Sequence, residues 1–279
     1  MSSARRMGHF SMPPAKIAAG PYVMGVLNAT PDSFSDGGHP EAAAPRALQM
    51  LEAGADMIDI GGESTRPGAE PVDEREEIAR VVPVVAALRS ATKAPISIDT
   101  MKPSVAMAAM SAGASIWNDV AALRSPGALE TAASMQRPVI LMHMLGEPRT
   151  MQSNPRYDDV VADVIAFLNS RVAAAQAKGV EEIWVDPGIG FGKTRDHNLA
   201  LLNNVQRIAE ETGKRVVIGA SRKRFIQAID ERAMDARADR LGGSVAAALI
   251  AAQNGAAMVR VHDVAETVQA LKVWRATQT

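Results

Sequence analysis

Eight short apolar runs alternate along this chain with longer segments that have helical spacing. The runs are rich in β-branched and other apolar residues and end at Gly, Pro or polar residues, as strands buried in a parallel sheet do. They lie at 22–27, 57–60, 96–98, 115–117, 139–142, 183–185, 216–218 and 258–261. The clearest helical segments are 41–53, 73–89, 158–178, 198–211 and 240–254. Eight strand–helix units in a chain of 279 residues predict an α/β fold, a single-domain (β/α)8 TIM barrel.

Glycine residues mark the ends of several helical segments. Each of these glycines lies a few residues before an apolar run, where a left-handed residue commonly stops a helix. They are Gly54, Gly113, Gly179 and Gly255. The alternative architecture is an open, doubly wound sheet. No Gly-x-Gly-x-x-Gly follows the first run, which favours the barrel.

Composition limits the class of protein. The net charge is −1, so no global field favours nucleic acid or a membrane surface, and the absence of Cys excludes disulfides and thiolate metal sites. Residues 1–20 contain no apolar run of signal-peptide length, and no stretch approaches the ~18 apolar residues of a spanning helix. We therefore expect a flexible tail at 1–20, a barrel at 21–279 and a cytoplasmic location.

Polar residues follow all eight apolar runs. In a barrel the ends of the strands meet at one mouth, where (β/α)8 enzymes place their active sites. A single Asp at a strand end is as often a helix cap, but eight polar ends together favour an active site. The residues are Asn28, Glu63, Ser64, Thr65, Arg66, Asp99, Asn118, Asp119, His143, Asp186, Ser221, Arg222, Lys223, Arg260, His262 and Asp263.

These residues divide by chemistry. Asp99, Asn118 and Asp186 suit a flat heterocycle with several N–H donors, because a carboxylate accepts two parallel hydrogen bonds. Lys223, Arg260 and His262 follow strands seven and eight, where barrels usually bind phosphate, and the stretch from Gly219 to Ser221 adds N–H groups and a helix start. Asn28 could hold an oxygen-ligated Mg²⁺ with a diphosphate, or it could simply begin a turn. The five His residues show no ligand spacing, and no Walker A run or Gly-x-Ser-x-Gly is present.

Ordered sequence blocks give a resemblance that covers the chain from about residue 22 to its end. They are GVLNATPDSFSDGG (25–38), DIGGESTRPGA (59–69), SIDT (97–100), NDV (118–120), LMHMLGEPRTMQ (141–152), DPGIGFGKT (186–194), ASRKRF (220–225), RLGGSVAAALIA (240–251) and RVHDV (260–264). On these blocks the chain resembles the dihydropteroate synthase family, the folate-pathway enzymes that sulfonamides target. The departures are Leu145, where Gln is common, and Gln227, where Gly is common; we expect them to change little.

The resemblance implies a reaction and a set of roles. It implies that 4-aminobenzoate condenses with (7,8-dihydropterin-6-yl)methyl diphosphate to give 7,8-dihydropteroate and diphosphate, in a homodimer that uses Mg²⁺. The implied metal ligand is Asn28, and the implied catalytic residues are Lys223, Arg260, His262, Asp36 and Phe34. The implied substrate-binding residues are Thr65, Arg66, Pro67, Asp99, Asn118, Met142, Asp186, Phe191, Gly219, Ser221, Lys223, Arg260 and His262. The loops at 28–38 and 63–69 would close over the substrates, and we expect the first loop to be disordered without ligand.

The chemistry implied by the family needs no general base. An aromatic amine is neutral at pH 7 and attacks with its free lone pair, so the difficult step is the departure of diphosphate. Electrostatic stabilisation of that leaving group is the main task. We therefore expect Arg260→Ala to lose on the order of 10²–10³ in rate with the fold intact.

Three alternatives are open. A pterin-dependent corrinoid methyltransferase domain would need no diphosphate site, so Lys223, Arg260 and His262 count against it. A non-catalytic paralogue that binds pterin diphosphate should lack loop residues such as Phe34, Asp36, Thr65 or Arg66, and all four are present. An unrelated barrel aldolase or lyase would want a Schiff-base lysine on a strand, and none of the predicted strands carries a lysine.

Overall fold

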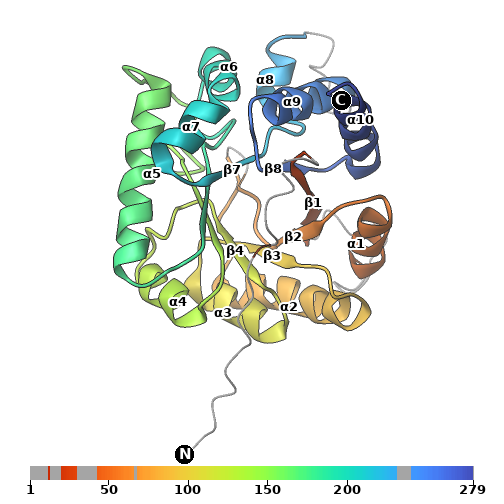
Figure 1. Ribbon diagram of the computed structural model, residues 1–279. Helices are drawn as coiled ribbons and strands as arrows, with labels where there is room; N and C mark the ends of the chain where they lie inside the picture. Colours follow the sequence, from red (N-terminus) through yellow and green to blue (C-terminus); the bar gives the residue numbers. More distant parts are fainter. Residues whose placement is uncertain (1–11, 13–19, 30–42, 66–67, 231–239, 279) are drawn as a thin grey trace, which may run out of the picture.

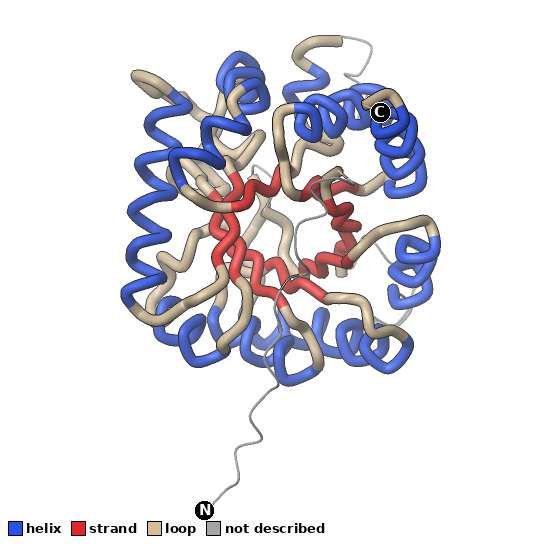
Figure 2. The backbone as a smooth tube through the Cα atoms, viewed as in Figure 1, coloured by secondary structure: helices blue, strands red, loops and turns tan. Residues whose placement is uncertain are grey.

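Eight parallel strands close into a barrel in the computed structural model, which describes Met12 and residues 20–29, 43–65, 68–230 and 240–278. The strands follow one another around the barrel in chain order, and β8 pairs with β1 (Figures 1 and 2). They are β1 (Tyr22–Asn28), β2 (Met57–Gly61), β3 (Ile96–Asp99), β4 (Ile116–Asp119), β5 (Val139–Met142), β6 (Ile183–Asp186), β7 (Arg215–Ile218) and β8 (Met258–Val261). Each expected strand is present, and its bounds agree with the expected run to within one residue, except that β4 ends two residues later than expected.

Helices surround the strands on the outside of the barrel (Figure 2). They are α1 (Ala43–Glu52), α2 (Glu74–Ala91), α3 (Pro103–Ala112), α4 (Ala128–Met135), α5 (Val160–Ala177), α6 (Arg195–Asn203), α7 (Val205–Thr212), α8 (Arg224–Gln227), α9 (Leu241–Gln253) and α10 (Val264–Ala276). The single helix expected at 198–211 was wrong, because Asn204 separates α6 from α7. The Asn204 side chain donates to the carbonyl of Ala200 at 2.8 Å, and such side-chain bonds compete with helical backbone geometry.

The glycine stops were predicted correctly. Gly54, Gly113, Gly179 and Gly255 all have positive φ, between 89° and 118°. Gly113 shows why no other residue fits easily: a Cβ there would lie 2.5 Å from Cγ of Arg89, and its φ is 118°. The turn after α3 therefore depends on glycine for both space and backbone conformation.

The strand side chains alternate between two buried environments. One apolar cluster fills the lumen and contains Met12, Tyr22, Met24, Met57, Ile116, Ile140, Trp184, Val217 and Met258. The neighbouring strand residues, including Val23, Ile58, Trp117 and Val185, belong instead to the larger cluster between the strands and the helices. Because side chains two positions apart on a strand share a face, the next lumen residues toward the strand ends can be identified from this pattern.

Met12 extends the lumen cluster at the amino ends of the strands. Its side chain is buried, and its N–H donates to both carboxylate oxygens of Glu182, at 3.0 and 3.2 Å. The rest of the segment expected to be a tail, 1–11 and 13–19, lies outside the described residues. At this position, therefore, the chain before the barrel is part of the packed structure.

Helix α5 corrects one expectation about apolar stretches. It has 18 residues with mean hydropathy 1.3, which is long and apolar enough to cross a membrane by length and composition. Its buried residues pack against β5 and the helices α4, α6 and α7. Such a helix is also what the wall of a barrel requires, since its apolar face covers the sheet.

Candidate active site

A polar layer lies above the apolar lumen cluster, toward the carboxyl ends of the strands. It is formed by the residues two or four positions beyond the cluster members, on the same face of each strand. Its polar members are Asn28, Asp59, Asn118, Asp186 and Arg260. The alternation thus brings most of the expected strand-end residues to one mouth, and adds Asp59.

Arg260 links strands on opposite sides of β1. Its Nε donates to Oδ2 of Asp59 at 2.6 Å, and its Nη2 donates to Oδ2 of Asp99 at 2.7 Å. Asn118 donates from Nδ2 to the same Asp59 oxygen at 3.0 Å. In this geometry Arg260 is paired with carboxylates of β2 and β3, and its expected contact with an anion stays a prediction.

Two carboxylate oxygens of this cluster have no partner among the residues that the structure describes. Oδ1 of Asp59 and Oδ1 of Asp99 are buried, and within the described residues no donor reaches either atom. Burial raises the pKa of Asp99 to about 7, with Arg260 opposing the rise and Asp59 adding to it. Buried polar atoms are nearly always hydrogen-bonded in native proteins, so these two acceptors indicate a place for a ligand with N–H donors.

A second cluster lies across the mouth, around Asp186. One oxygen of Asp186 accepts the N–H of Gly188 at 2.7 Å, and burial raises the pKa of the carboxyl. Lys223 lies with its Nζ 3.9 Å from the ring centroid of Phe191, and its charge acts on Asp186. Phe191 and Met142 are buried in a small apolar cluster with Val120, Met101, Met144 and Met151. The mouth therefore offers carboxylate, ammonium and apolar surfaces together.

Ser221 contacts both the backbone and the ring of His262. The Ser221 Oγ accepts the backbone N–H of His262 at 3.2 Å and lies 3.1 Å from the ring Nδ1. We assign the hydroxyl as donor to Nδ1, and this assignment places the ring proton on Nε2. Burial lowers the pKa of His262 to about 3, with Arg260 and Arg222 adding to the effect. His262 is thus a neutral donor at pH 7 rather than a cation.

The helix after β7 is short. Helix α8 has only four residues, Arg224–Gln227, with Lys223 at its N-cap. One turn aligns few peptide dipoles, so the positive helix end expected here contributes little. The charge on this side of the mouth comes instead from the side chains of Lys223 and Arg260.

Asn28 ends β1 and is half-buried. Its side-chain amide makes no hydrogen bond with any part of the chain that the structure describes. A free amide oxygen at the mouth fits Mg²⁺, which is commonly held by one or two protein oxygens together with substrate phosphates. Among the described residues, no group of three His, Cys, Asp or Glu residues could hold a metal. The donor set therefore fits a metal carried largely by the substrate.

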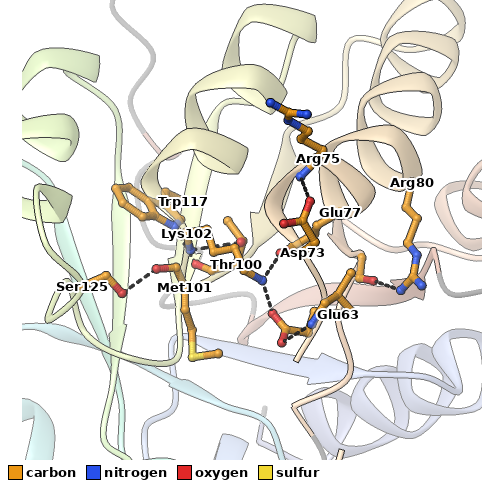
Figure 3. A network of polar contacts seen from close by, with 12 residues as sticks. Glu63, Asp73, Arg75, Glu77, Arg80, Thr100, Met101, Lys102, Trp117 and Ser125 are labelled. Carbon is orange, nitrogen blue, oxygen red and sulfur yellow. Dashed lines mark hydrogen bonds and ion pairs between the residues drawn. The ribbon is translucent and has the colours of Figure 1, made fainter. Parts of the chain in front are cut away.

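A charged network fixes the loop after β2 (Figure 3). Lys102 donates from Nζ to Glu63 at 2.5 Å and to Glu77 at 2.6 Å, while Glu63 also accepts the N–H of Val72 at 3.1 Å. Burial raises the pKa of Glu77, and the Lys102 bond opposes that rise. The network anchors both ends of the loop that carries the half-buried Thr65.

Four expected site residues lie outside the described part of the chain: Phe34, Asp36, Arg66 and Pro67. The expected order or disorder of the first loop falls there too, at 30–42. Asp119, by contrast, is described and is structural: its carboxylate accepts the N–H groups of Ala121 and Leu123, both at 2.7 Å. For that residue the helix-cap or turn interpretation is correct.

Comparisons with known proteins identify the family. The family model described as "Pterin binding enzyme" matches residues 24–262. The dihydropteroate synthase of Haemophilus influenzae is 49% identical over 263 residues, which cover 92% of this chain and 94% of that protein. The chain belongs to the dihydropteroate synthase family of pterin-binding enzymes. The (β/α)8 fold is that of the family: a Xanthomonas albilineans dihydropteroate synthase solved with 4-aminobenzoic acid superposes with a TM-score of 0.86 at 49% identity, covering 94% of each chain. A second structure of the enzyme from Xanthomonas albilineans, in complex with 7,8-dihydropteroate, gives a TM-score of 0.82 at 44% identity over 94% of each chain.

Two residues of the family's barrel were missed from the sequence. Asp59 lies inside the buried run of β2, where a fully buried carboxylate is rare unless it is paired; that acid among apolar residues was the available signal. Lys193 is buried in the loop after β6 and bonds to His143. Its partner lies 50 residues earlier in the chain, so no local pattern indicated it.

Proposed function

We propose that this chain is a dihydropteroate synthase, which joins 4-aminobenzoate to (7,8-dihydropterin-6-yl)methyl diphosphate and releases diphosphate. Its similarity to named dihydropteroate synthases covers nearly the whole chain. The 4-aminobenzoic acid and 7,8-dihydropteroate bound in two of those structures are a substrate and the product of this reaction. The chain is therefore a transferase of folate biosynthesis.

The observation that carries the proposal is the set of carboxylate and amide acceptors at the mouth. A dihydropterin presents an amino group and ring N–H groups along one edge, and these are donors that need acceptors. Asp186, Asn118 and the buried, unpartnered oxygen of Asp99 provide such acceptors. A carboxylate accepts two parallel bonds from an amino-pyrimidine edge, which favours this ring over one with acceptors alone.

The faces and the remaining edge of the ring have their own surfaces. Met142 and Phe191 provide apolar area for a flat ring, and the Lys223 ammonium lies over the Phe191 ring. In our proposal, Lys223 donates to an acceptor atom of the pterin while Asp186 accepts from its donor edge. The two side chains carry opposite charge, so a ring that lies between them meets both kinds of partner.

Departure of diphosphate is the step that the protein must assist, because the attacking aromatic amine is already neutral. Arg260 keeps Nη1 free of partners within the described residues, since only Nε and Nη2 are used. The neutral His262 has an Nε2 proton to donate. We assign both groups to the leaving diphosphate, where removing one such donor costs on the order of 10²–10³ in rate.

Mg²⁺ is part of the proposal, with Asn28 as its protein ligand. The fit is the amide of Asn28 at the end of β1, which has no hydrogen-bond partner within the described part of the chain. When bound, the ion would neutralise charge on the diphosphate. The proposed aminobenzoate pocket combines Thr65 and Ser221 with four residues outside the described part of the chain: Phe34, Asp36, Arg66 and Pro67.

Two properties implied by the family complete the proposal. We expect a homodimer, which light scattering of the purified chain would detect as twice the monomer mass. A cytoplasmic location is also expected, and cell fractionation tests it.

The direct test is an assay with both substrates. The protein is incubated with Mg²⁺, the pterin diphosphate and 4-aminobenzoate, and diphosphate release is followed. We expect release that requires both organic substrates and stops when Mg²⁺ is chelated. Release that is independent of 4-aminobenzoate would indicate hydrolysis and would contradict the proposal.

A further inference from the structure

Side-chain hydrogen bonds hold the loop after β6 in place. Three consecutive carbonyl oxygens each accept a hydrogen bond from a side chain: those of Gly190, Phe191 and Gly192. The donors are Gln152 at 2.7 Å, Lys193 at 3.0 Å and Tyr157 at 2.8 Å, respectively. All three glycines of the loop, at 188, 190 and 192, have positive φ. The loop has no ladder of its own, so these side chains satisfy its backbone.

Lys193 is the member of this set whose burial is energetically unfavourable. Its side chain is only 4% exposed, and Nζ donates to Phe191 O at 3.0 Å, His143 Nδ1 at 2.9 Å and His143 O at 3.4 Å. An ammonium has three N–H donors and no acceptor, so all three donors are used. Within the described residues, no carboxylate forms a hydrogen bond or ion pair with it. Burying a charge against neutral acceptors is unfavourable, whereas the neighbouring carbonyls are satisfied by neutral donors.

The carbonyl that Lys193 holds belongs to the residue that supports Lys223. The Lys223 ammonium lies 3.9 Å from the centroid of the Phe191 ring, a contact in which the ring face attracts the cation. Gly190 lies under the same side chain, since a Cβ there would be 3.0 Å from Cδ of Lys223. The path of Lys223 is therefore set by the backbone and ring at 190–191, and Lys193 holds that backbone.

His143 anchors the other end of this arrangement. It follows β5, and its backbone N–H donates to the carbonyl of Asp186 at 2.9 Å. Its carbonyl also approaches Gly188 so closely that a Cβ at Gly188 would lie 1.9 Å from that oxygen. Lys193 thus joins two strand ends, one of which carries the Asp186 carboxylate.

We propose that Lys193 is a positioning residue for the pterin: by tying Phe191 to His143 it fixes the ring on which Lys223 lies, and so places the Lys223 ammonium opposite Asp186. The inference rests on the proposed function, in which Lys223 and Asp186 hold the pterin. Lys193 itself lies behind Phe191 and acts through it. The opposing interpretation is that Lys193 only stabilises the fold.

The test measures binding of 6-hydroxymethyl-7,8-dihydropterin, which lacks the diphosphate, by titration calorimetry. Lys193→Met keeps the length of the side chain and removes its donors, and we expect the Kd to rise about five- to tenfold. Lys193→Gln keeps two donors and should give an intermediate Kd. Lys178→Met, which removes an exposed ammonium paired with Glu130, is the control and should leave the Kd unchanged. Thermal unfolding is recorded for each variant.

A double-mutant cycle separates positioning from general stabilisation. Phe191→Leu removes the ring, and if Lys193 acts through that ring, Lys193→Met should weaken binding little further in the Phe191→Leu background. Loss factors that multiply in the double variant would overturn the proposal. An unchanged Kd in Lys193→Met together with a lower unfolding temperature would also overturn it. If the unsubstituted chain fails to bind the dihydropterin, the proposed function itself fails, and this inference with it.

Discussion

Replacing Arg260 with alanine should unfold the protein more easily as well as slow the reaction. Arg260 makes ion pairs of 2.6 and 2.7 Å with Asp59 and Asp99, and the exposed fractions of the three side chains are only 18%, 0% and 12%. At an effective dielectric constant near 20, charges about 4 Å apart attract by about 4 kcal/mol. Breaking a buried pair from one side costs about 3–5 kcal/mol, because the remaining charge stays buried. We expect the free energy of unfolding to fall by that amount at pH 8. The sequence alone predicted that the fold would stay intact, whereas the ion pairs predict a measurable loss of stability.

The stability lost in Arg260→Ala should depend on pH. Burial already raises the pKa of Asp99 to about 7, above its ordinary value. Without Arg260, which opposes that rise, the pKa of Asp99 rises further, so the native state binds more protons than the unfolded state from about pH 4 upward. Stability then falls as the pH rises through that range, by up to about 1.4 kcal/mol per pH unit for each proton. The loss relative to the unsubstituted protein should therefore be smaller at pH 5.5 than at pH 8.

Urea unfolding at the two pH values measures the loss. The control is Arg207→Ala, which removes an exposed pair with Glu211 and should cost less than about 1 kcal/mol at either pH. Adding Asp59→Asn to Arg260→Ala should recover part of the stability at pH 8, since one unpaired carboxylate is removed. An equal loss at both pH values, or no loss at all, would refute the reasoning from these ion pairs.

Three further predictions concern the loops and the neighbouring histidine. Gly188→Ala should destabilise by more than the about 1–3 kcal/mol that positive φ alone costs, because its Cβ would lie 1.9 Å from a backbone oxygen; Gly179→Ala, with positive φ and open space, is the urea-unfolding control. Ser221→Ala should change the ¹⁵N shifts of His262 from the Nε2-protonated pattern toward a mixture of tautomers, and an unchanged spectrum would contradict the assigned hydrogen bond. Burial lowers the pKa of Lys193 to about 7, so the unfolded state binds more protons than the native state above that pH. The stability of the unsubstituted chain relative to Lys193→Met should therefore rise above pH 7 by up to about 1.4 kcal/mol per pH unit. Parallel curves of stability against pH for the two proteins would contradict this.

Local patterns were sufficient to predict the architecture. Each strand is a short apolar run bounded by polar residues or Gly. Gly54 and Gly113 have positive φ and lie at helix ends, as their positions in the sequence predicted. The break between α6 and α7 was missed because the apolar spacing continues through Asn204, and only the bond from its side chain to Ala200 interrupts the helix. Helical periodicity records which face is buried, but not such a competing hydrogen bond.

The partners at the mouth could not be predicted in the same way. No local pattern indicated that Arg260 bonds to Asp59, 201 residues earlier in the chain. The pattern of strand ends predicts which side chains converge at the mouth. Which of them then form hydrogen bonds with one another depends on the shape of the closed barrel. Asp186 could be predicted from the end of its strand alone, and it lies at the end of β6 as expected.

The most direct measurement is the rate at which Asp186→Asn forms 7,8-dihydropteroate, followed by mass spectrometry at varied pterin diphosphate. Asparagine can still accept the N–H of Gly188, which Asp186 accepts at 2.7 Å, so the loop keeps its bond while the carboxylate is lost. A charged hydrogen bond contributes about 1.5–3 kcal/mol, and we therefore expect kcat/KM for the pterin substrate to fall about 10- to 100-fold. An unchanged kcat/KM would contradict the claim that the carboxylates at the mouth of the barrel bind the pterin.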